Sequence, residues 1–163
     1  MFIAVDVGNT NVSIGILKDM EVIHFFKVET AIFENQKKAK TLILEKLNGI
    51  LPPSQKICAI YICSVVPSLN KNIKAIFRSL FKTDVALIGE DVVVPILNRY
   101  RLPKQVGQDR LVNAYAGLKL YGNGLIIIDF GTAITFDIVS KTGEYLGGLI
   151  APGLKLMQES LPG

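Results

Sequence analysis

The sequence contains 163 residues, 50% of them hydrophobic and 20% charged, a balance typical of a globular chain rather than a disordered or fibrous one. The 18 basic residues exceed the 14 acidic ones, for a net charge of +4, but they are scattered with few aromatic residues among them. We therefore predict a protein that handles phosphates or other small anions, and no binding to nucleic acid. No apolar run approaches the roughly 20 residues of a membrane span, and no secretory signal precedes Asp6, so we predict a cytoplasmic protein that does not bind membranes.

In chain order, the first half predicts a mixed sheet with helices packed on it. The turn Gly8-Asn9-Thr10-Asn11 separates the first two apolar runs, and Gly and Asn supply turn conformations. Helical spacing of apolar residues predicts the first helix, which Pro52-Pro53 would end. The elements follow a β-β-β-α-β-α-β order typical of an α/β fold. Strands are expected at 2–7, 12–17, 22–28, 57–63 and 85–88, and helices at 34–47 and 69–81.

The two cysteines, Cys58 and Cys63, are five positions apart in a strand-like run, so alternation directs them to opposite faces. They cannot pair with each other there, and the single His24 cannot complete a zinc site. We expect both cysteines to be core residues of a protein in a reducing compartment.

The second half begins with an irregular basic segment, 92–108, followed by a helix over 111–120 for which Asp109 could serve as N-cap. After Gly122-Asn123-Gly124 the chain repeats an earlier pattern. The run Ile3 to Thr10 is echoed by Ile126 to Thr132: an apolar strand ends in Asp-x-Gly, a Thr follows within two residues, and a second apolar strand comes next. A repeat of this kind indicates a duplicated architecture.

Two copies of the hairpin predict two similar domains that face each other, each contributing an acidic turn to a shared cleft. We place the first domain at 1–95 and the start of the second at 96–163. Few residues follow the second hairpin, so we expect the second domain to be incomplete. Residues 1–95 should then be well ordered alone, and the part after about Tyr100 should be mobile, supported by a dimer partner or strand-swapped.

The first acidic turn has the residue types of a phosphate-binding loop. Gly8 lets backbone approach closely, and the following amides with Asn9, Thr10 and Asn11 could surround phosphate oxygens. Asp6 could hold a Mg²⁺ through water, because hard cations take oxygen ligands. A plain hairpin turn would use the same residues, but the second copy, Asp129-Phe130-Gly131-Thr132, makes a purely local explanation less favourable.

Two further motifs allow a functional and a structural interpretation. In Gly107-Gln108-Asp109-Arg110, the acid could accept a proton from a substrate hydroxyl while the Arg binds a carboxylate; an N-cap beside a solvated Arg is the alternative. In Gly147-Gly148 with Pro152-Gly153, the glycines would permit close approach to a nucleotide or ion, or form a simple strand-to-helix turn.

Together these four motifs, with Ser64-Val65-Val66-Pro67, resemble the type III pantothenate kinases, members of the acetate and sugar kinase, heat-shock chaperone and actin superfamily. The resemblance covers the whole chain. It implies a ribonuclease H-like (actin-like ATPase) fold, with duplicated β-β-β-α-β-α-β domains across an ATP cleft. It also implies ATP-dependent phosphorylation of pantothenate to 4′-phosphopantothenate, the first step of coenzyme A biosynthesis.

The resemblance further implies roles for individual residues. Asp109 looks like the general base, Asp129 like the ligand of a monovalent cation (K⁺ or NH₄⁺), and Tyr100 like a substrate contact within the segment 98–110. Mg²⁺ would accompany ATP, and the protein would be a homodimer whose partner subunit completes the substrate pocket. The implied ATP contacts are Asp6, Val7, Gly8, Asn9, Thr10, Asn11, Val12, Ser13 and Thr132. The implied pantothenate contacts are Tyr100, Gly107, Gln108, Asp109 and Arg110.

Family members continue well beyond residue 163, so we expect a chain that lacks the C-terminal part of the site. Two alternative functions come from other classes: a non-catalytic relative that acts as a transcriptional accessory or binding protein, and a chaperone-like ATPase of the same superfamily fold.

Overall fold

The computed structural model describes residues 1–51 and 56–159, and the chain divides into two compact units, Met1–Val93 and Val94–Gly163. Each unit has its own sheet and its own hydrophobic cluster. No helix in the described part of the chain is long and apolar enough to cross a membrane.

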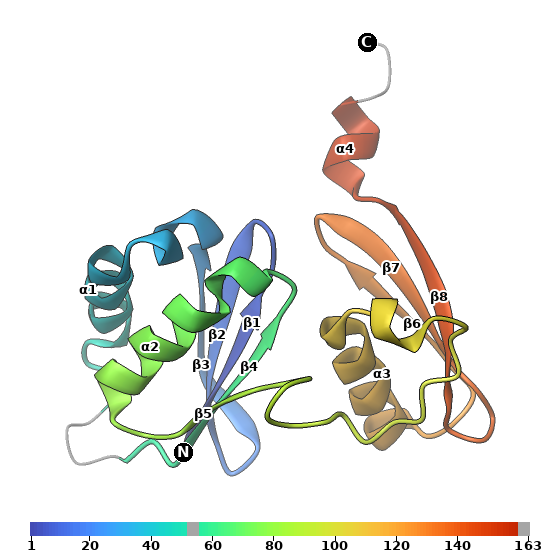
Figure 1. The fold of residues 1–163 in the computed structure, drawn as a ribbon, viewed down its shortest axis with the longest axis horizontal. Coiled ribbons are helices and arrows are strands. Elements are labelled where there is room, and N and C mark those ends of the chain that lie inside the picture. Colours follow the sequence, from blue (N-terminus) through green and yellow to red (C-terminus); the bar gives the residue numbers. More distant parts are fainter. Residues whose placement is uncertain (52–55, 160–163) are drawn as a thin grey trace. The chain divides into compact units, whose positions relative to one another are not determined.

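Unit 1 is built on a five-stranded sheet of order β3-β2-β1-β4-β5 (Figure 1). The first three strands are antiparallel neighbours, and β1, β4 and β5 run parallel. This is the predicted β-β-β-α-β-α-β order. Its strands are β1 (Phe2–Val7), β2 (Asn11–Lys18), β3 (Glu21–Glu29), β4 (Ala59–Ser64) and β5 (Val85–Leu87), and its helices are η1 (Thr30–Glu34), α1 (Gln36–Leu47), η2 (Pro67–Leu69) and α2 (Asn70–Phe81).

The core of unit 1 lies between the sheet and the two α-helices, which cover the same face (Figure 1). Ile3, Val5 and Val7 alternate along β1 with the exposed Ala4 and Asp6, so one face of the strand is apolar. The buried side chains of the helices pack on that face: Ala39, Ile43 and Leu47 from α1, and Ile73, Ile76 and Phe77 from α2.

Helix α1 begins two residues later than its apolar spacing predicts. The side chain of Asn35 accepts a hydrogen bond from the Lys38 amide at 3.1 Å and caps the helix, while residues 30–34 form the short 3-10 helix η1. The helix ends at Leu47, and Gly49 follows with φ +77°. Pro52-Pro53, the predicted terminator, lies outside the described residues.

The prediction that both cysteines are core residues is wrong for Cys58. Cys63 is buried within β4, but Cys58 precedes the strand and is exposed. Its amide donates to the carbonyl of Met1 at 2.8 Å, which places Cys58 at the end of the sheet where β1 begins.

Unit 2 contains a three-stranded antiparallel sheet of order β6-β7-β8 with one long helix, α3, against it (Figure 1). The buried cluster joins Val106, Leu111 and Ala114 to Val139 and Tyr145 of the sheet. The elements of the unit are η3 (Pro103–Gln105), α3 (Gln108–Tyr121), β6 (Leu125–Phe130), β7 (Ala133–Val139), β8 (Tyr145–Pro152) and α4 (Leu154–Glu159).

The predicted hairpin repeat is present in both sheets. Asp6 stands one residue before the end of β1 opposite Ser13, and Asp129 stands one residue before the end of β6 opposite Thr135. The covered faces differ, however. Ile126, Ile128 and Phe130, which correspond to the buried Ile3, Val5 and Val7, are 68%, 45% and 67% exposed, because α3 packs on the opposite face of β6.

Candidate active site

The first acidic turn is fastened to the rest of unit 1 by Thr30. The Thr30 hydroxyl donates to the Gly8 carbonyl at 2.7 Å, and the Thr30 amide donates to the Thr10 carbonyl at 2.9 Å. Within the turn, the Gly8 amide donates to the Asn11 carbonyl at 3.0 Å. A Cβ on Gly8 would lie 3.1 Å from that same oxygen, so a larger residue would press on the turn. The loop therefore has a defined shape set by its own chain.

The candidate ATP contacts in this turn divide into two groups. Asp6, Asn9, Thr10 and Asn11 are exposed, and Gly8 and Ser13 are half-buried. Val7 and Val12 are fully buried in the core, so they can offer a ligand only backbone atoms.

The second acidic turn lies against Gly153. The Gly131 amide donates to the Ala133 carbonyl at 3.0 Å, and a Cβ on Gly153 would overlap the carbonyl of Thr132. The chain after β8 thus passes directly beside the turn, and glycine at this position is required by that internal contact.

Asp129 is exposed near the end of β6, and its Oδ2 accepts a hydrogen bond of 3.4 Å from Asn113 of α3. Among the residues that the structure describes, no three His, Cys, Asp or Glu side chains lie close enough together to hold a metal ion. A cation at Asp129 would therefore need other oxygen ligands, such as backbone carbonyls or nucleotide phosphates.

The start of α3 differs from the prediction that Asp109 is the N-cap. The helix begins at Gln108, and Gly107, with extended backbone (φ −60°, ψ 143°), is the N-cap. Asp109 lies within the first turn and is half-buried. Burial raises the pKa of its carboxyl and the nearby Asp137 adds to this, although the amide and charge of Arg110 oppose it.

Arg110 is not a solvated side chain, because it forms an ion pair inside unit 2. Its guanidinium donates from Nε to Asp137 Oδ1 at 2.7 Å and from Nη2 to the Phe136 carbonyl at 2.8 Å. The Arg110 side chain is 14% exposed and the Asp137 side chain 0%. The Tyr145 hydroxyl donates to the same Asp137 oxygen at 2.7 Å, and burial raises its pKa.

Asp137 and Tyr145 are not among the residues that the sequence motifs indicate. An acid with apolar neighbours on both sides, Phe136 and Ile138, is the one signal in the sequence that could have identified Asp137. Its second oxygen, Oδ2, is buried and has no hydrogen-bond partner in the described part of the structure.

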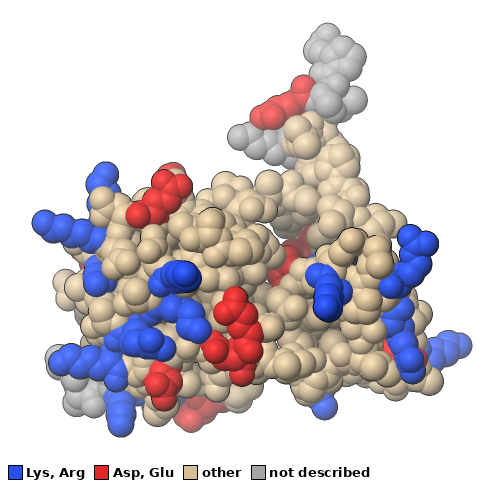
Figure 2. Space-filling model, viewed as in Figure 1, with Lys and Arg blue, Asp and Glu red and all other residues tan. Residues whose placement is uncertain are grey.

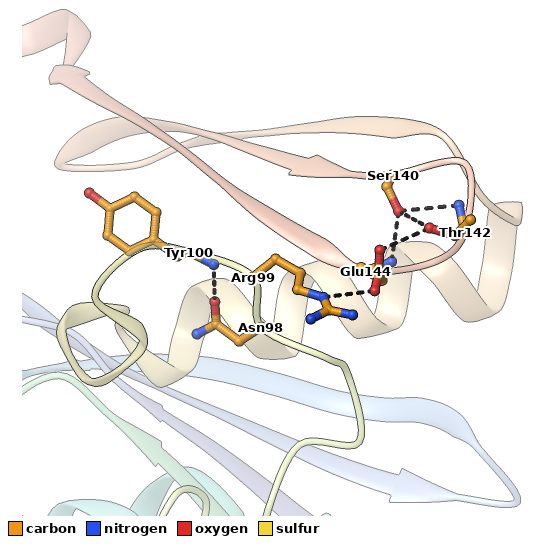
Figure 3. A network of polar contacts seen from close by, with 6 residues as sticks. All are labelled: Asn98, Arg99, Tyr100, Ser140, Thr142 and Glu144. Carbon is orange, nitrogen blue, oxygen red and sulfur yellow. Dashed lines mark hydrogen bonds and ion pairs between the residues drawn. The ribbon is translucent and has the colours of Figure 1, made fainter.

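Tyr100 is held beside β8 by its neighbours in the chain (Figure 3). The Tyr145 amide donates to the Leu97 carbonyl at 2.9 Å, and the Arg99 amide donates to the Tyr145 carbonyl at 2.8 Å. The Asn98 side chain accepts from the Tyr100 amide at 3.0 Å. Segment 97–99 therefore pairs with the first residue of β8.

The turn between β7 and β8 supports the same segment through Glu144 (Figure 3). Glu144 accepts from Arg99 Nε at 2.9 Å and from the Thr142 hydroxyl at 3.0 Å, which lowers the pKa of its carboxyl. Ser140 Oγ accepts from the amides of Thr142 and Glu144 at 3.1 and 3.0 Å and fixes the turn.

Gly147 and Gly148 of β8 make room for side chains of this chain. A Cβ on Gly147 (φ +111°) would lie 2.6 Å from the ring of Tyr100, and a Cβ on Gly148 would overlap the Phe136 carbonyl and meet the Arg110 guanidinium. The glycine pair thus places two candidate substrate contacts, Tyr100 and Arg110, along β8.

An open cavity of about 480 Å³ lies elsewhere, at the end of the unit 1 sheet where β1 begins. Its cations include Lys82, which ends α2 and suits the negative end of the helix dipole. None of the predicted site residues lines this cavity. Its lining residues are Lys56, Cys58, Arg78, Lys82, Thr83 and Asp84.

On the face drawn in Figure 2, Lys and Arg side chains lie on both units, with acidic side chains among those of unit 1.

Solved structures of low sequence identity establish the class of fold. The chain aligns with a Baf family protein from Campylobacter jejuni, described as a transcriptional activator, over 99% of this chain and 61% of that one (TM-score 0.55, 19% identity). It aligns with a putative 2-dehydro-3-deoxygalactonokinase from Sinorhizobium meliloti over 92% of this chain and 53% of that one (TM-score 0.53, 16% identity). These likenesses confirm the predicted ribonuclease H-like, actin-like ATPase fold.

Sequence comparison then gives the family. Residues 2–163 match the model of the type III pantothenate kinase family. A type III pantothenate kinase from Sulfurihydrogenibium is 41% identical over 95% of this chain and 62% of its own length, and one from Myxococcus xanthus is 36% identical over 99% and 63%. The chain therefore belongs to the type III pantothenate kinase family, and it spans less than two thirds of the length of these relatives.

Proposed function

We propose that the protein containing this chain transfers the γ-phosphoryl group of ATP to the primary hydroxyl of pantothenate. The product is 4′-phosphopantothenate, and the reaction is the first step of coenzyme A biosynthesis. The observation that carries the proposal is the family match over residues 2–163. The position of Asp109 in the first turn of α3 supports it.

In this reaction Asp109 is the general base. It orients the substrate hydroxyl and accepts its proton as the bond to phosphorus forms, a role typically worth about 10²–10⁴-fold in rate. Burial raises the pKa of the Asp109 carboxyl, which brings its basicity closer to that required near neutral pH.

Each unit contributes its own ATP contacts. In unit 1 the exposed polar residues of the turn at Gly8 bind phosphate oxygens, with Val7 and Val12 contributing backbone only. In unit 2 the contact is Thr132, which is exposed. A single carboxylate, Asp6, suits a Mg²⁺ that takes its other ligands from phosphates and water. The divalent ion would neutralise charge on the transferring phosphoryl group.

Pantothenate binds at the start of α3 and at β8, with Tyr100 and Arg110 as side-chain contacts and Gly107 and Gln108 as the adjoining backbone. Three Arg110 donor contacts go to Asp137 and Phe136, so its Nη1 is the group left for a substrate carboxylate. The protein acts as a homodimer in the cytoplasm, where the partner subunit completes the pocket.

A coupled ADP-release assay, run with and without pantothenate, tests this proposal. We expect ADP release only when pantothenate is present, and its loss in Asp109→Asn with ATP binding retained. Asp19→Asn serves as the control, because Asp19 is exposed in the turn after β2 and its positive φ of 51° suits Asn. Slow ATP hydrolysis at a rate that does not depend on pantothenate would favour a chaperone-like ATPase. No ADP release under any condition would favour a non-catalytic binding protein.

Asp129 is a ligand of the monovalent cation. A carboxylate close to nucleotide phosphates is repelled unless a cation lies between them. We expect activity to be low in Na⁺ buffer and to rise with K⁺ or NH₄⁺, and Asp129→Asn to lose this response. Equal rates of ADP release in Na⁺ and K⁺ would remove Asp129 from the ion site.

A further inference from the structure

We propose that Asp137, steadied by the hydroxyl of Tyr145, is a positioning residue that holds the Arg110 guanidinium at the first turn of α3, beside the Asp109 carboxylate. This inference rests on the proposed function, because Arg110 and Asp109 are there the substrate contact and the general base.

The geometry restricts the Arg110 guanidinium from three sides. Asp137 Oδ1 accepts a hydrogen bond from Arg110 Nε and lies 2.7 Å from Nη2. The Phe136 carbonyl accepts a hydrogen bond from Nη2 at 2.8 Å. On the side of β8, Gly148 leaves just enough space for Nη2. A guanidinium is planar, so fixing two of its nitrogens also fixes the direction of the third.

Tyr145 in turn restricts Asp137. Its hydroxyl donates to the oxygen that receives Arg110, and its ring is fully buried in the core of unit 2. The backbone of Tyr145 also pairs with Leu97 and Arg99, next to Tyr100. One residue thus connects the support of Arg110 with the support of Tyr100.

Stability alone is a poor explanation for this ion pair. Burying two charges costs desolvation energy that their attraction often only balances, and well-packed apolar residues frequently replace such pairs without loss. Here the Asp137 side chain is fully buried, and its Oδ2 has no hydrogen-bond partner among the described residues. An orienting role accounts for a charge in so unfavourable a place.

The same arrangement sets the charge around Asp109. The charged groups that act on the Asp109 carboxyl are Arg110 on its own helix and Asp137 on the neighbouring strand. The Tyr145 hydroxyl donates to Asp137, and the charges of both acids help to raise the pKa of Tyr145. Asp137 raises the pKa of Asp109 and Arg110 lowers it. Removing the negative charge of Asp137 removes one of the causes that raise the pKa of Asp109, so this pKa falls.

Kinetics of Asp137→Asn in the intact protein that contains this chain test the proposal, with Asp19→Asn in an exposed turn as the control. We expect KM for pantothenate to rise on the order of 10²-fold, because a misplaced contact can cost that much, while KM for ATP stays unchanged. The acid limb of the pH profile should move to lower pH, because a base of lower pKa stays deprotonated further into acid. A purely structural defect would instead lower the apparent kcat, because less of the protein would be folded and active. It would change neither KM for pantothenate nor the position of the acid limb.

A double-mutant cycle with Arg110→Gln asks whether Asp137 acts through Arg110. In the Arg110→Gln background, we expect Asp137→Asn to cause little further change in KM for pantothenate, because the group it orients is gone. Additive effects of the two substitutions on this KM, or an unchanged KM and pH limb in Asp137→Asn, would overturn the proposal.

Tyr145→Phe decides the question if Asp137→Asn does not fold. It removes one hydroxyl, keeps the buried ring, and should raise KM for pantothenate roughly three- to tenfold; Tyr121→Phe at the exposed end of α3 is the control. An unchanged KM in a folded Tyr145→Phe would overturn the inference. A wild-type protein without pantothenate-dependent ADP release would instead overturn the proposed function and the inference with it.

Discussion

Asp109 occupies a position that disfavours its own ionised form. Burial is the main cause of its raised pKa, and Asp137 adds to it. A carboxyl whose pKa is higher in the folded than in the unfolded chain binds its proton more tightly when folded. The folded state therefore loses stability as the pH rises from the ordinary value of 3.8 through the raised pKa.

Replacing Asp109 by Asn, which resembles the neutral carboxyl, should remove that penalty. We expect Asp109→Asn to melt at a higher temperature than the wild-type protein at pH 7, and the difference to shrink as the pH falls towards 3.8. Thermal melts across this pH range measure it. A variant that is less stable than the wild type at pH 7 would show that the negative charge benefits the helix start more than burial costs it.

At the residue scale, local motifs predicted the two acidic turns and the Gly-Gln-Asp-Arg segment. Each motif places glycine and charged or polar residues at the end of an apolar strand or at the start of a helix. The role of Gly147 and Gly148 and the contacts of Arg110 could not be predicted in this way. Arg110 and Asp137 are 27 positions apart in the sequence. The residues around each of them do not indicate that the two side chains form an ion pair.

At the scale of elements, β1 and β6 show what a strand's own pattern determines. Each is predicted from an apolar run of the same pattern, and each carries its acid one residue before the end of the strand. Their burial is opposite, because burial depends on which face a helix covers: α1 and α2 cover the face of Ile3, whereas α3 covers the other face of β6. The repeat in the sequence contains no information about these helices.

Ile3 and Ile126 occupy corresponding positions of the repeat and form a matched pair. In this 163-residue chain, Ile3→Ala should cost about 2–5 kcal/mol because it leaves a cavity in a closed core. Ile126→Ala should cost less than about 1 kcal/mol because Ile126 is 68% exposed. Urea unfolding of the two variants makes the comparison. A large loss in Ile126→Ala would mean that the apolar face of β6 is covered in solution.

At the scale of the whole molecule, the two units have separate cores of unequal size. Every member of the larger cluster lies between Ile3 and Leu87, whereas the smaller one consists of Val106, Leu111, Ala114, Val139 and Tyr145 with its packed neighbours. The order of elements predicted the two sheets, but the strength of each core depends on packing that only the structure shows.

A fragment of residues 1–93 should therefore fold by itself, because its cluster needs no residue of unit 2. We expect it to retain its secondary structure and to melt in a single cooperative transition, measured by circular dichroism. The matched fragment of residues 94–163 should melt with less cooperativity. A non-cooperative melt of residues 1–93 would show that unit 1 depends on contacts outside itself.

Tyr145 forms three hydrogen bonds, through its amide, its carbonyl and its hydroxyl, and this predicts how fast the surrounding amides exchange. Its amide and carbonyl hold segment 97–99, and its hydroxyl reaches the acid that holds Arg110. Any local opening that frees the start of β8 must release the Tyr100 segment at the same moment. The amide protons of Tyr145 and Arg99 should therefore exchange with deuterium at closely similar rates, as members of one opening unit.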